Sequence, residues 1–293
     1  MSMPRIAVGI CAYNEENNIG RVLQNLLEQN LPENSKILVV CSGCTDKTPQ
    51  IVEGFHRENS RVELITESVR TGKANALNKI FQIVEKSADV LVLVNADALP
   101  SHKSIEKLVS KLISGDEGAV FARPVPFEGV QGFSYKIVRV IWRLHHLISL
   151  LQKPKLSGEL CAIRVSCLQK IPENIATDEP YIELAIRKQG YNIAYVPEAL
   201  VHIRCPTNVV DLLKQRKRIL AGHMQLQNST GFKVSTSNFR NILRAVSALK
   251  PSEVLYASLG GFLEAIAYIH VKVAFGKLAS YAWEPIRSTK TSI

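Results

Sequence analysis

The chain has 293 residues, which is enough to bury the core of one large domain or of one domain with a tail. Its formal net charge of +10 favours an anionic partner such as a nucleotide or a membrane surface, and no nucleic-acid-binding motif accompanies that charge. Six cysteines are too few for a disulfide framework at this length, so we expect a reducing, cytoplasmic setting.

Strands and helices are predicted to alternate in the first part of the chain, which indicates βαβ units and a mainly parallel sheet. The strands are predicted at 5–10, 36–41, 61–65, 90–95 and 118–122, and the helices at 19–27, from 48, from 72 and at 101–113. The run 90–95 is apolar until its last residue, so it is predicted to be buried on both faces. It delivers Asp97 to the carboxyl end of the sheet, where open α/β sheets bind ligands.

The pattern changes after residue 122. The predicted elements there are a helix at 136–151, a strand at 156–164, a helix at 178–188, a short strand at 193–196 closed by Pro197, and a basic helix from 206. The segment 253–275 is the most apolar long stretch. We therefore expect a domain at 1–230, with halves at 1–122 and 123–230, followed by a helical C-terminal region at 231–293.

Polar motifs follow several of these strands. They are Ala12-Tyr13-Asn14-Glu15, Ser42-Gly43-Cys44-Thr45-Asp46-Lys47-Thr48, Arg70-Thr71-Gly72-Lys73-Ala74-Asn75-Ala76-Leu77-Asn78, Asn95-Ala96-Asp97, Asp178-Glu179, Gly190-Tyr191 with Tyr195-Val196-Pro197-Glu198-Ala199, and Gln215-Arg216-Lys217-Arg218. In this order and at this spacing they resemble the motifs of the family 2 glycosyltransferases, over about residues 4–230. The resemblance implies an α/β fold of the GT-A type, which is a Rossmann-like, mainly parallel sheet flanked by helices, here with a helical, partly apolar C-terminal region.

The resemblance also implies an enzyme that transfers a sugar from a nucleotide-sugar donor to an acceptor hydroxyl with inversion, the acceptor being a saccharide or linked to a lipid. This chemistry needs a neutralised diphosphate and a deprotonated hydroxyl. Asp97 and Asn95 would hold a divalent cation, Mg²⁺ or Mn²⁺, and Glu179 or Asp178 would be the base. The remaining residues implied are Ala12, Asn14, Glu15, Ser42, Arg70 and Lys73 for the donor, and Gln215, Arg216 and Arg218 for the acceptor and diphosphate side.

Four positions depart from the family pattern. Asn95 replaces the first acid of the D-x-D metal motif, Cys41 and Ser42 replace two acids of the nucleotide loop, and Ile219 replaces a Trp. An amide oxygen still binds a cation, but with less charge. These departures leave open an alternative, a catalytically silent, glycosyltransferase-like protein that binds nucleotide sugars. A sugar-phosphate nucleotidyltransferase is disfavoured because no glycine-rich loop follows the first strand.

The base within the acid pair is not settled by the sequence. Counting back from Gly190-Tyr191 puts the family's base at Glu179, which is slightly favoured, and two adjacent like charges raise one pKa. Pro180 biases Glu179 away from helical geometry, however, so Asp178 stays an alternative.

Two segments predict contact with a membrane. The helix at 136–151 combines a basic stripe with an apolar face, as interfacial helices do. The stretch 253–275 is about long enough to span a bilayer, but its titratable residues make it a poor span. The alternatives are a buried core helix or two helices broken at Gly260-Gly261. Since the first predicted strand begins close to Met1, we expect no signal peptide and a peripheral association with the cytoplasmic face.

Overall fold

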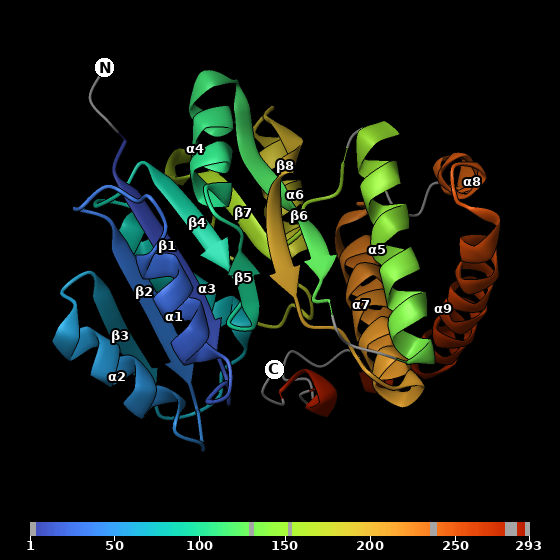
Figure 1. Ribbon diagram of the computed structural model, residues 1–293, viewed down its shortest axis with the longest axis horizontal. Coiled ribbons are helices and arrows are strands. Elements are labelled where there is room, and N and C mark those ends of the chain that lie inside the picture. Colours follow the sequence, from blue (N-terminus) through green and yellow to red (C-terminus); the bar gives the residue numbers. More distant parts are fainter. Residues whose placement is uncertain (1–3, 129–131, 152–153, 235–238, 279–285, 291–293) are drawn as a thin grey trace.

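The structure is a computed structural model that describes residues 4–128, 132–151, 154–234, 239–278 and 286–290. Its centre is an eight-stranded sheet in the order β3-β2-β1-β4-β7-β6-β8-β5 (Figure 1). The strands are β1 Ile6–Ala12, β2 Lys36–Ser42, β3 Val62–Glu67, β4 Val90–Val94, β5 Ala98–Pro100, β6 Glu117–Pro126, β7 Leu160–Arg164 and β8 Asn192–Ile203.

The predicted mainly parallel sheet is confirmed, with antiparallel pairs confined to its C-terminal half. β1 pairs in parallel with both β2 and β4, and β2 pairs in parallel with β3. β7 lies antiparallel between β4 and β6, whereas β8 is parallel to β6. The short β5 pairs antiparallel with the outer side of β8. The first four strands in the sheet order therefore end at one edge, where a ligand site is expected.

Helices cover both faces of the sheet. They are α1 Ile19–Leu27, α2 Thr48–Glu58, α3 Lys73–Val84, α4 Ser104–Ser114, α5 Phe133–Leu151, α6 Glu179–Lys188, α7 Val209–Thr230, α8 Phe239–Ser247 and α9 Pro251–Leu278. The buried residues of α1, α2, α4 and α5 form one core with the sheet, and those of α3 and α6 form the other. Along β4, Val92 and Val94 face the first core while Leu91 and Leu93 face the second, so this strand is buried on both faces as predicted.

β8 is much longer than the predicted strand at 193–196. It continues through Pro197 to Ile203. The register jumps where Ala122 pairs with Val196 and Arg123 pairs with Leu200, so residues 197–199 form an irregularity that lets the strand pass a proline without a backbone donor. The short β5 was also not predicted, because three residues are too few for a clear periodic signal. α8 lies inside the C-terminal region predicted to be helical, although its own bounds were not predicted.

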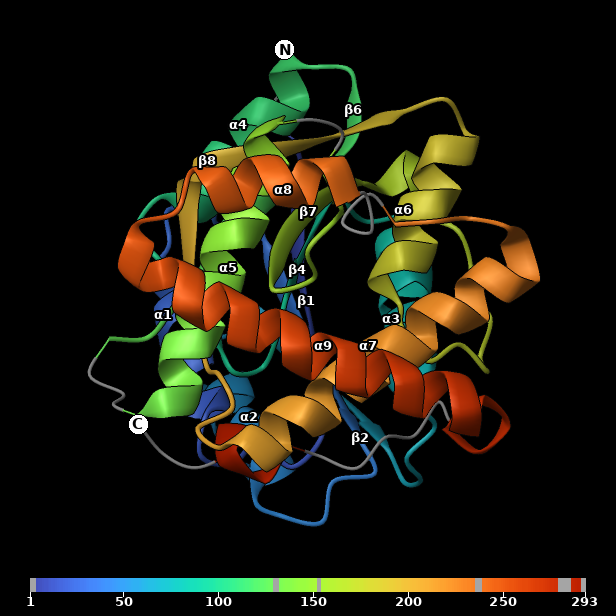
Figure 2. The same ribbon diagram turned by 90° about the vertical axis from the view of Figure 1, so that its right-hand side faces the viewer.

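A layer of long helices flanks the C-terminal half of the sheet, and α9 crosses both α5 and α7 (Figure 2). α9 runs through Gly260 and Gly261 without interruption, so the alternative of two helices broken there is wrong. The alternative of a buried core helix is also wrong, because Leu255 and Phe262 on its outer face are 62% and 65% exposed.

The basic stripe of α5 is partly engaged with protein, whereas Lys136 and Arg139 remain exposed, so the expected membrane contact stays a prediction. The Lys136 ammonium lies 5.8 Å from the centroid of the Tyr256 ring on α9. Arg143 pairs with Glu253 of α9 at 3.3 Å, and His146 Nδ1 lies 2.8 Å from a tyrosine hydroxyl on β8. The outward apolar surface of this layer is formed mainly by α8 and α9, and Phe133, Leu150 and Leu151 at the two ends of α5 are exposed as well.

Candidate active site

The predicted site residues gather at the carboxyl ends of β1, β2 and β4, together with the start of α6. A small pocket there is lined by Lys73 at the start of α3, Asn95 after β4, Gly158 before β7, and Glu179 at the start of α6. These four positions are far apart in the sequence, so the pocket is created by the order of strands in the sheet.

Asn95 is fixed by contacts on both of its amide atoms. Its Nδ2 donates to Glu159 Oε2 at 2.8 Å, and its Oδ1 accepts a hydrogen bond from Lys73 Nζ at 3.3 Å. The backbone N–H of Asn95 also donates to the Glu159 carbonyl at 3.3 Å. Asn95 therefore links the predicted cation motif to a second carboxylate, which lies across the antiparallel β4–β7 pair.

Glu159 is a site residue that the sequence did not reveal. Burial raises its pKa to about 7, the negative charge of Asp97 adds to the rise, and the hydrogen bond from Asn95 opposes it. Asp97 in turn has a raised pKa, chiefly because of burial, while Lys290 and Lys73 act against that rise. The sequence feature that could have pointed to Glu159 is the segment Ser157-Gly158-Glu159 at the start of the strand predicted at 156–164. No pattern in the sequence shows that this strand pairs with β4.

Lys73 joins this region to the acid pair. Its ammonium lies 3.0 Å from Asp178 Oδ2 and 3.4 Å from Glu179 Oε1, in addition to its contact with Asn95. Burial disfavours the charged lysine, but the two carboxylates outweigh that effect and raise its pKa, so Lys73 stays protonated.

The acid pair opens α6, with Asp178 as the N-cap residue and Glu179 as the first helical residue. Pro180 therefore sits within the first turn, where its missing N–H is not needed by the helix, and it does not displace Glu179. The Glu179 side chain is 27% exposed and that of Asp178 only 11%.

The two carboxyl groups differ in their ease of ionisation. Burial, followed by the negative charge of Glu179, raises the pKa of Asp178. Burial also opposes ionisation of Glu179, but Lys73 and Lys155 outweigh it and lower the pKa of Glu179. Glu179 is thus the more accessible and the more readily ionised acid, as a general base requires.

Gly158 makes room for Glu179. A Cβ atom at position 158 would lie 2.3 Å from Glu179 Oε1 and 2.4 Å from its Cγ, so any side chain there would displace the carboxylate. The absence of a side chain at Gly158 thus leaves the space that the Glu179 side chain occupies.

The loop after β1 contacts the loop after β2. Asn14, at φ 52°, accepts a hydrogen bond from the Thr45 N–H at 2.8 Å and donates to the Thr45 hydroxyl at 3.0 Å. The Glu15 N–H donates to the Thr48 hydroxyl at 2.8 Å. Ala12 is buried at the end of β1, so it contributes to the loop through its backbone.

The loop before α3 completes this surface. The Arg70 guanidinium lies over the Tyr13 ring, 3.9 Å from its centroid, and Ser42 Oγ accepts from the Thr71 N–H at 3.4 Å. Gly43 has φ +60°, and a Cβ there would lie 2.4 Å from the Arg70 backbone nitrogen, so this position requires glycine. The structure thus brings together all of the residues assigned to the donor.

The basic motif of α7 is divided between two environments. Arg216 forms two hydrogen bonds with Glu264 of α9, at 2.6 and 2.8 Å. Arg218 is close enough to Glu179 to lower its pKa. Gln215 is partly buried on the same helix. Arg218 therefore faces the acid pair, whereas Arg216 ties α7 to α9.

Comparisons with known proteins agree with this fold. Residues 7–171, which are more than half of the sequence, match the family described as "Glycosyl transferase family 2". The chain therefore belongs to this family. It is 26% identical to a glycosyltransferase of Haemophilus influenzae over 258 residues, covering 83% of this chain and 76% of that protein.

Two further proteins show how far the similarity extends. The chain is 31% identical to glycosyltransferase AglD of Haloferax volcanii over 119 residues, which are 39% of this chain and only 19% of AglD. The mannosyltransferase PcManGT of Pyrobaculum calidifontis, solved with GDP-Man and Mn²⁺, shares the fold with a TM-score of 0.64 at 23% identity, covering 99% of this chain and 84% of that one. The predicted GT-A fold is confirmed by this likeness.

Proposed function

We propose that this chain transfers a sugar from a nucleotide-sugar donor to an acceptor hydroxyl, with inversion at the anomeric carbon. The observation that carries the proposal is the position of Lys73, which contacts Asn95 of the cation motif and both acids of the 178–179 pair. A donor diphosphate and an acceptor hydroxyl bound on the two sides of this lysine would lie next to each other, as in-line displacement requires.

Asp97 and Asn95 are the proposed cation ligands, with Glu159 as a further carboxylate. Among the described residues, no group of three or more His, Cys, Asp or Glu side chains is arranged to enclose a metal. This fits Mg²⁺ or Mn²⁺, since such ions are commonly held by one or two carboxylates together with substrate phosphates. The bound ion would neutralise the charge that develops on the leaving diphosphate.

The protein side chains carry out the proton transfer. The carboxylate of Glu179, or that of Asp178, accepts the proton of the acceptor hydroxyl as its oxygen bonds to the anomeric carbon and the bond from that carbon to the diphosphate breaks. Lys73 and Arg218 are cations next to the acid pair and are proposed to stabilise the leaving diphosphate as well. The loops around Asn14, Ser42 and Arg70 are proposed to bind the nucleoside. PcManGT was solved with GDP-Man, which makes a guanosine diphosphate sugar one donor to test.

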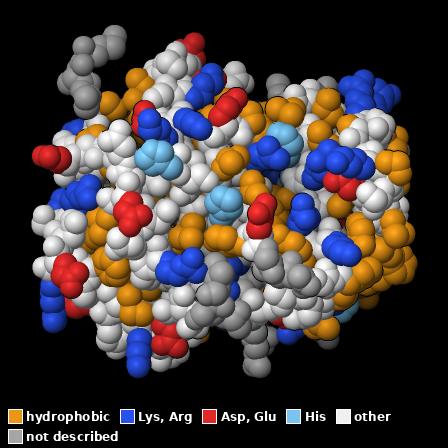
Figure 3. Space-filling view, viewed as in Figure 1, with side chains coloured by type: hydrophobic (Ala, Val, Ile, Leu, Met, Phe, Trp, Pro, Cys, Tyr) orange, Lys and Arg blue, Asp and Glu red, His pale blue; other side chains and the backbone are white. Residues whose placement is uncertain are grey.

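An outward apolar surface supports a proposal of peripheral membrane attachment. Among the described residues, one helix, Pro251–Ala274, is long and apolar enough to cross a membrane by length and composition, and only 17% of its most apolar part is buried. Figure 3 shows apolar side chains gathered over the edge formed by α8 and α9. The exposed apolar residues of these helices are Leu243, Val254, Leu255, Phe262, Ile266, Tyr268, Ile269 and Val273.

Charge on the same surface favours an anionic bilayer. Arg240, Arg244, Lys250 and Lys272 are exposed on or next to these helices. The two acids within α9, Glu253 and Glu264, are paired with Arg143 and Arg216 and so do not oppose contact with lipid. We propose that the enzyme binds the cytoplasmic face of the membrane and that its acceptor is lipid-linked or a growing polysaccharide.

The test of the proposed function is a donor-turnover assay. Purified protein is incubated with nucleotide sugars and Mn²⁺ or Mg²⁺, and release of nucleoside diphosphate is measured by chromatography. We expect turnover that EDTA abolishes and that Asp97→Ala removes, because Asp97 is the remaining acid of the motif. Full activity in EDTA would contradict the role of the cation. Donor binding without turnover for any donor or acceptor would favour the catalytically silent alternative.

A further inference from the structure

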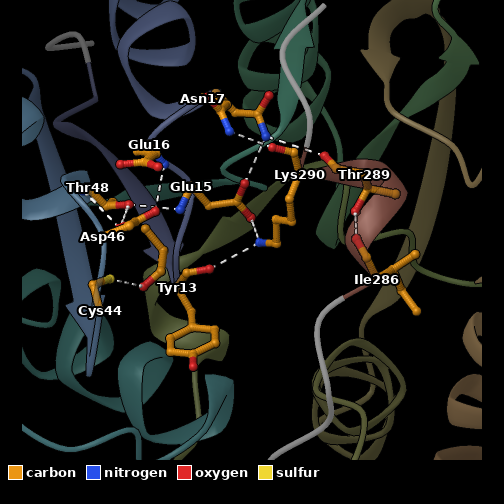
Figure 4. A network of polar contacts seen from close by, with 12 residues as sticks. Tyr13, Glu15, Glu16, Asn17, Cys44, Asp46, Thr48, Ile286, Thr289 and Lys290 are labelled. Carbon is orange, nitrogen blue, oxygen red and sulfur yellow. Dashed lines mark hydrogen bonds and ion pairs between the residues drawn. The ribbon is translucent and has the colours of Figure 1, made fainter.

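The segment 286–290, here called the C-terminal strap, folds back from the end of the described chain onto the loop after β1 (Figure 4). Asn17 Nδ2 donates to the Lys290 carbonyl at 2.8 Å, and Asn18 Nδ2 donates to the Thr289 carbonyl at 3.4 Å. The Ser288 N–H donates to Asp211 Oδ2 at 3.1 Å. The strap is therefore held from both the donor loop and the start of α7, and its position is specific.

The strap delivers one cation, the Lys290 ammonium, to the candidate donor site. Lys290 Nζ donates to the Tyr13 carbonyl at 3.1 Å and forms an ion pair with Glu15, whose carboxylate is buried (Figure 4). The ammonium also acts on Asp97, whose charge in turn raises the pKa of Glu15. Lys290 thus contacts the loop after β1 and is close enough to the proposed cation ligand Asp97 to counteract the rise of its pKa.

This arrangement has a consequence for ligand binding. A divalent cation on Asp97 would bring two positive charges near the Lys290 ammonium, whose own partner is the Glu15 carboxylate. A further anion that contacts both the ion and the ammonium would reduce this repulsion. A diphosphate is such an anion, and it would accept hydrogen bonds from an ammonium as well as bind the ion. A neutral sugar would offer no charge to either cation.

We propose that Lys290 binds the diphosphate of the nucleotide donor, so that the C-terminal strap completes the donor site. The inference rests on the proposed function, since it assumes that a nucleoside diphosphate binds beside Asp97. It adds a residue that lies outside every motif of the sequence and more than a hundred residues beyond the segment matched by the family.

The test compares the affinities of GDP and UDP for wild type and Lys290→Gln by titration calorimetry in the presence of Mn²⁺. For whichever diphosphate binds the wild type, we expect at least about a tenfold loss, since a charge-assisted hydrogen bond is removed. The matched nucleoside monophosphate, GMP or UMP, is expected to lose less. Lys290→Arg is expected to restore most of the diphosphate affinity, and the difference between wild type and Lys290→Gln is expected to shrink at high salt.

Lys86→Gln is the matched control, because Lys86 is an exposed lysine at the opposite edge of the sheet and the substitution changes the net charge equally. If Lys290→Gln binds the diphosphate as tightly as the wild type does, Lys290 has only a structural role as the ion-pair partner of Glu15. If the variant binds the diphosphate more tightly, Lys290 blocks the site instead of binding the ligand. Either result overturns the inference while leaving the proposed function intact, provided that Asp97→Ala still weakens binding. If neither diphosphate binds the wild type, the inference about Lys290 is wrong, whereas the proposed function is decided separately by the donor-turnover assay.

Discussion

Lys73 is the residue on which the arrangement of the site depends. Its ammonium contacts Asn95, Asp178 and Glu179, which come from two loops that are separated by more than eighty residues. Without a cation in this place, the carboxylates of the acid pair would repel each other and one would take up a proton. With it, the pKa of Glu179 is lowered, so its carboxylate is ionised and free of a proton before the acceptor binds.

Gly158→Ala tests whether the position of Glu179 matters for turnover. The new methyl group would overlap the Glu179 side chain and displace its carboxylate. We expect kcat to fall by about 100-fold, since a shift of about 1 Å at a reacting group has that effect, while the melting temperature changes little. Steady-state kinetics and thermal unfolding provide the two readouts.

Gly54→Ala is the control for that substitution, because Gly54 lies within α2 and no atom is found within 4 Å of a Cβ built there. Gly54→Ala should keep the kcat of the wild type. If Gly158→Ala also keeps the kcat of the wild type, the position of the Glu179 carboxylate does not matter for turnover.

The lowered pKa of His145 on α5 leads us to expect that the free energy of unfolding falls in mild acid. Burial lowers its pKa to about 3, with Lys155 and Arg216 adding to the effect, whereas the unfolded chain binds that proton near pH 6.5. The unfolded state therefore holds more protons between these values, and the free energy of unfolding falls as the pH falls through this window. From pH 6.5 to 5 the loss is about 2 kcal/mol.

Urea unfolding at pH 6.5 and pH 5 measures this loss. Glu159 acts in the opposite direction, because its raised pKa lets the native state take up a proton first, but this contribution is common to variants at other positions. The decrease should therefore be larger in the wild type than in His145→Gln by about 2 kcal/mol. His102→Gln, at an exposed position, is the control that should follow the wild type. Equal decreases in wild type and His145→Gln would contradict the prediction.

At the scale of the elements, α9 differs from a core helix because many of its large apolar side chains are exposed. One side of it packs on α5 and α7 through residues such as Ala267 and Val271, and its other side leaves large apolar side chains exposed. A surface of this kind either binds another body or remains a risk for aggregation. The adjacent arginines of α8 make an anionic lipid surface the proposed partner.

The double variant Phe262→Glu with Ile269→Glu tests the proposed membrane contact. Both side chains are more than 60% exposed in the structure, so the fold should tolerate the change. Loss of their burial in lipid is expected to weaken binding to vesicles of phosphatidylglycerol and phosphatidylcholine by at least about 100-fold in a sedimentation assay. Ile113→Glu on α4, also at an exposed apolar position, should bind as the wild type does. No vesicle binding by the wild type would contradict the proposal.

At the scale of the whole molecule, the sequence predicts the parallel half of the fold well, because each of its strands and helices has a clear apolar pattern. It misses β5 and the bulge that carries β8 past Pro197, since both depend on pairing between distant strands. The division of the chain at residues 122 and 230 stays a prediction.

The same reason limits prediction of the site. Asp97, Lys73 and the acid pair lie in motifs, so their proximity could be expected from the family resemblance. Glu159 depends on the pairing of β7 with β4, and Lys290 depends on the return of the C-terminal strap to the first loop. Neither contact leaves a pattern in the sequence near these residues.

The central claim is that the acid pair at the start of α6 removes the proton of the acceptor while a donor is held beside it. The most direct measurement is the turnover of donor by Glu179→Gln and Asp178→Asn, with donor affinity determined separately by calorimetry. We expect Glu179→Gln to lose about three powers of ten or more in kcat while its donor affinity stays within a few fold of the wild type. Near-normal turnover in both amide variants would contradict the mechanism.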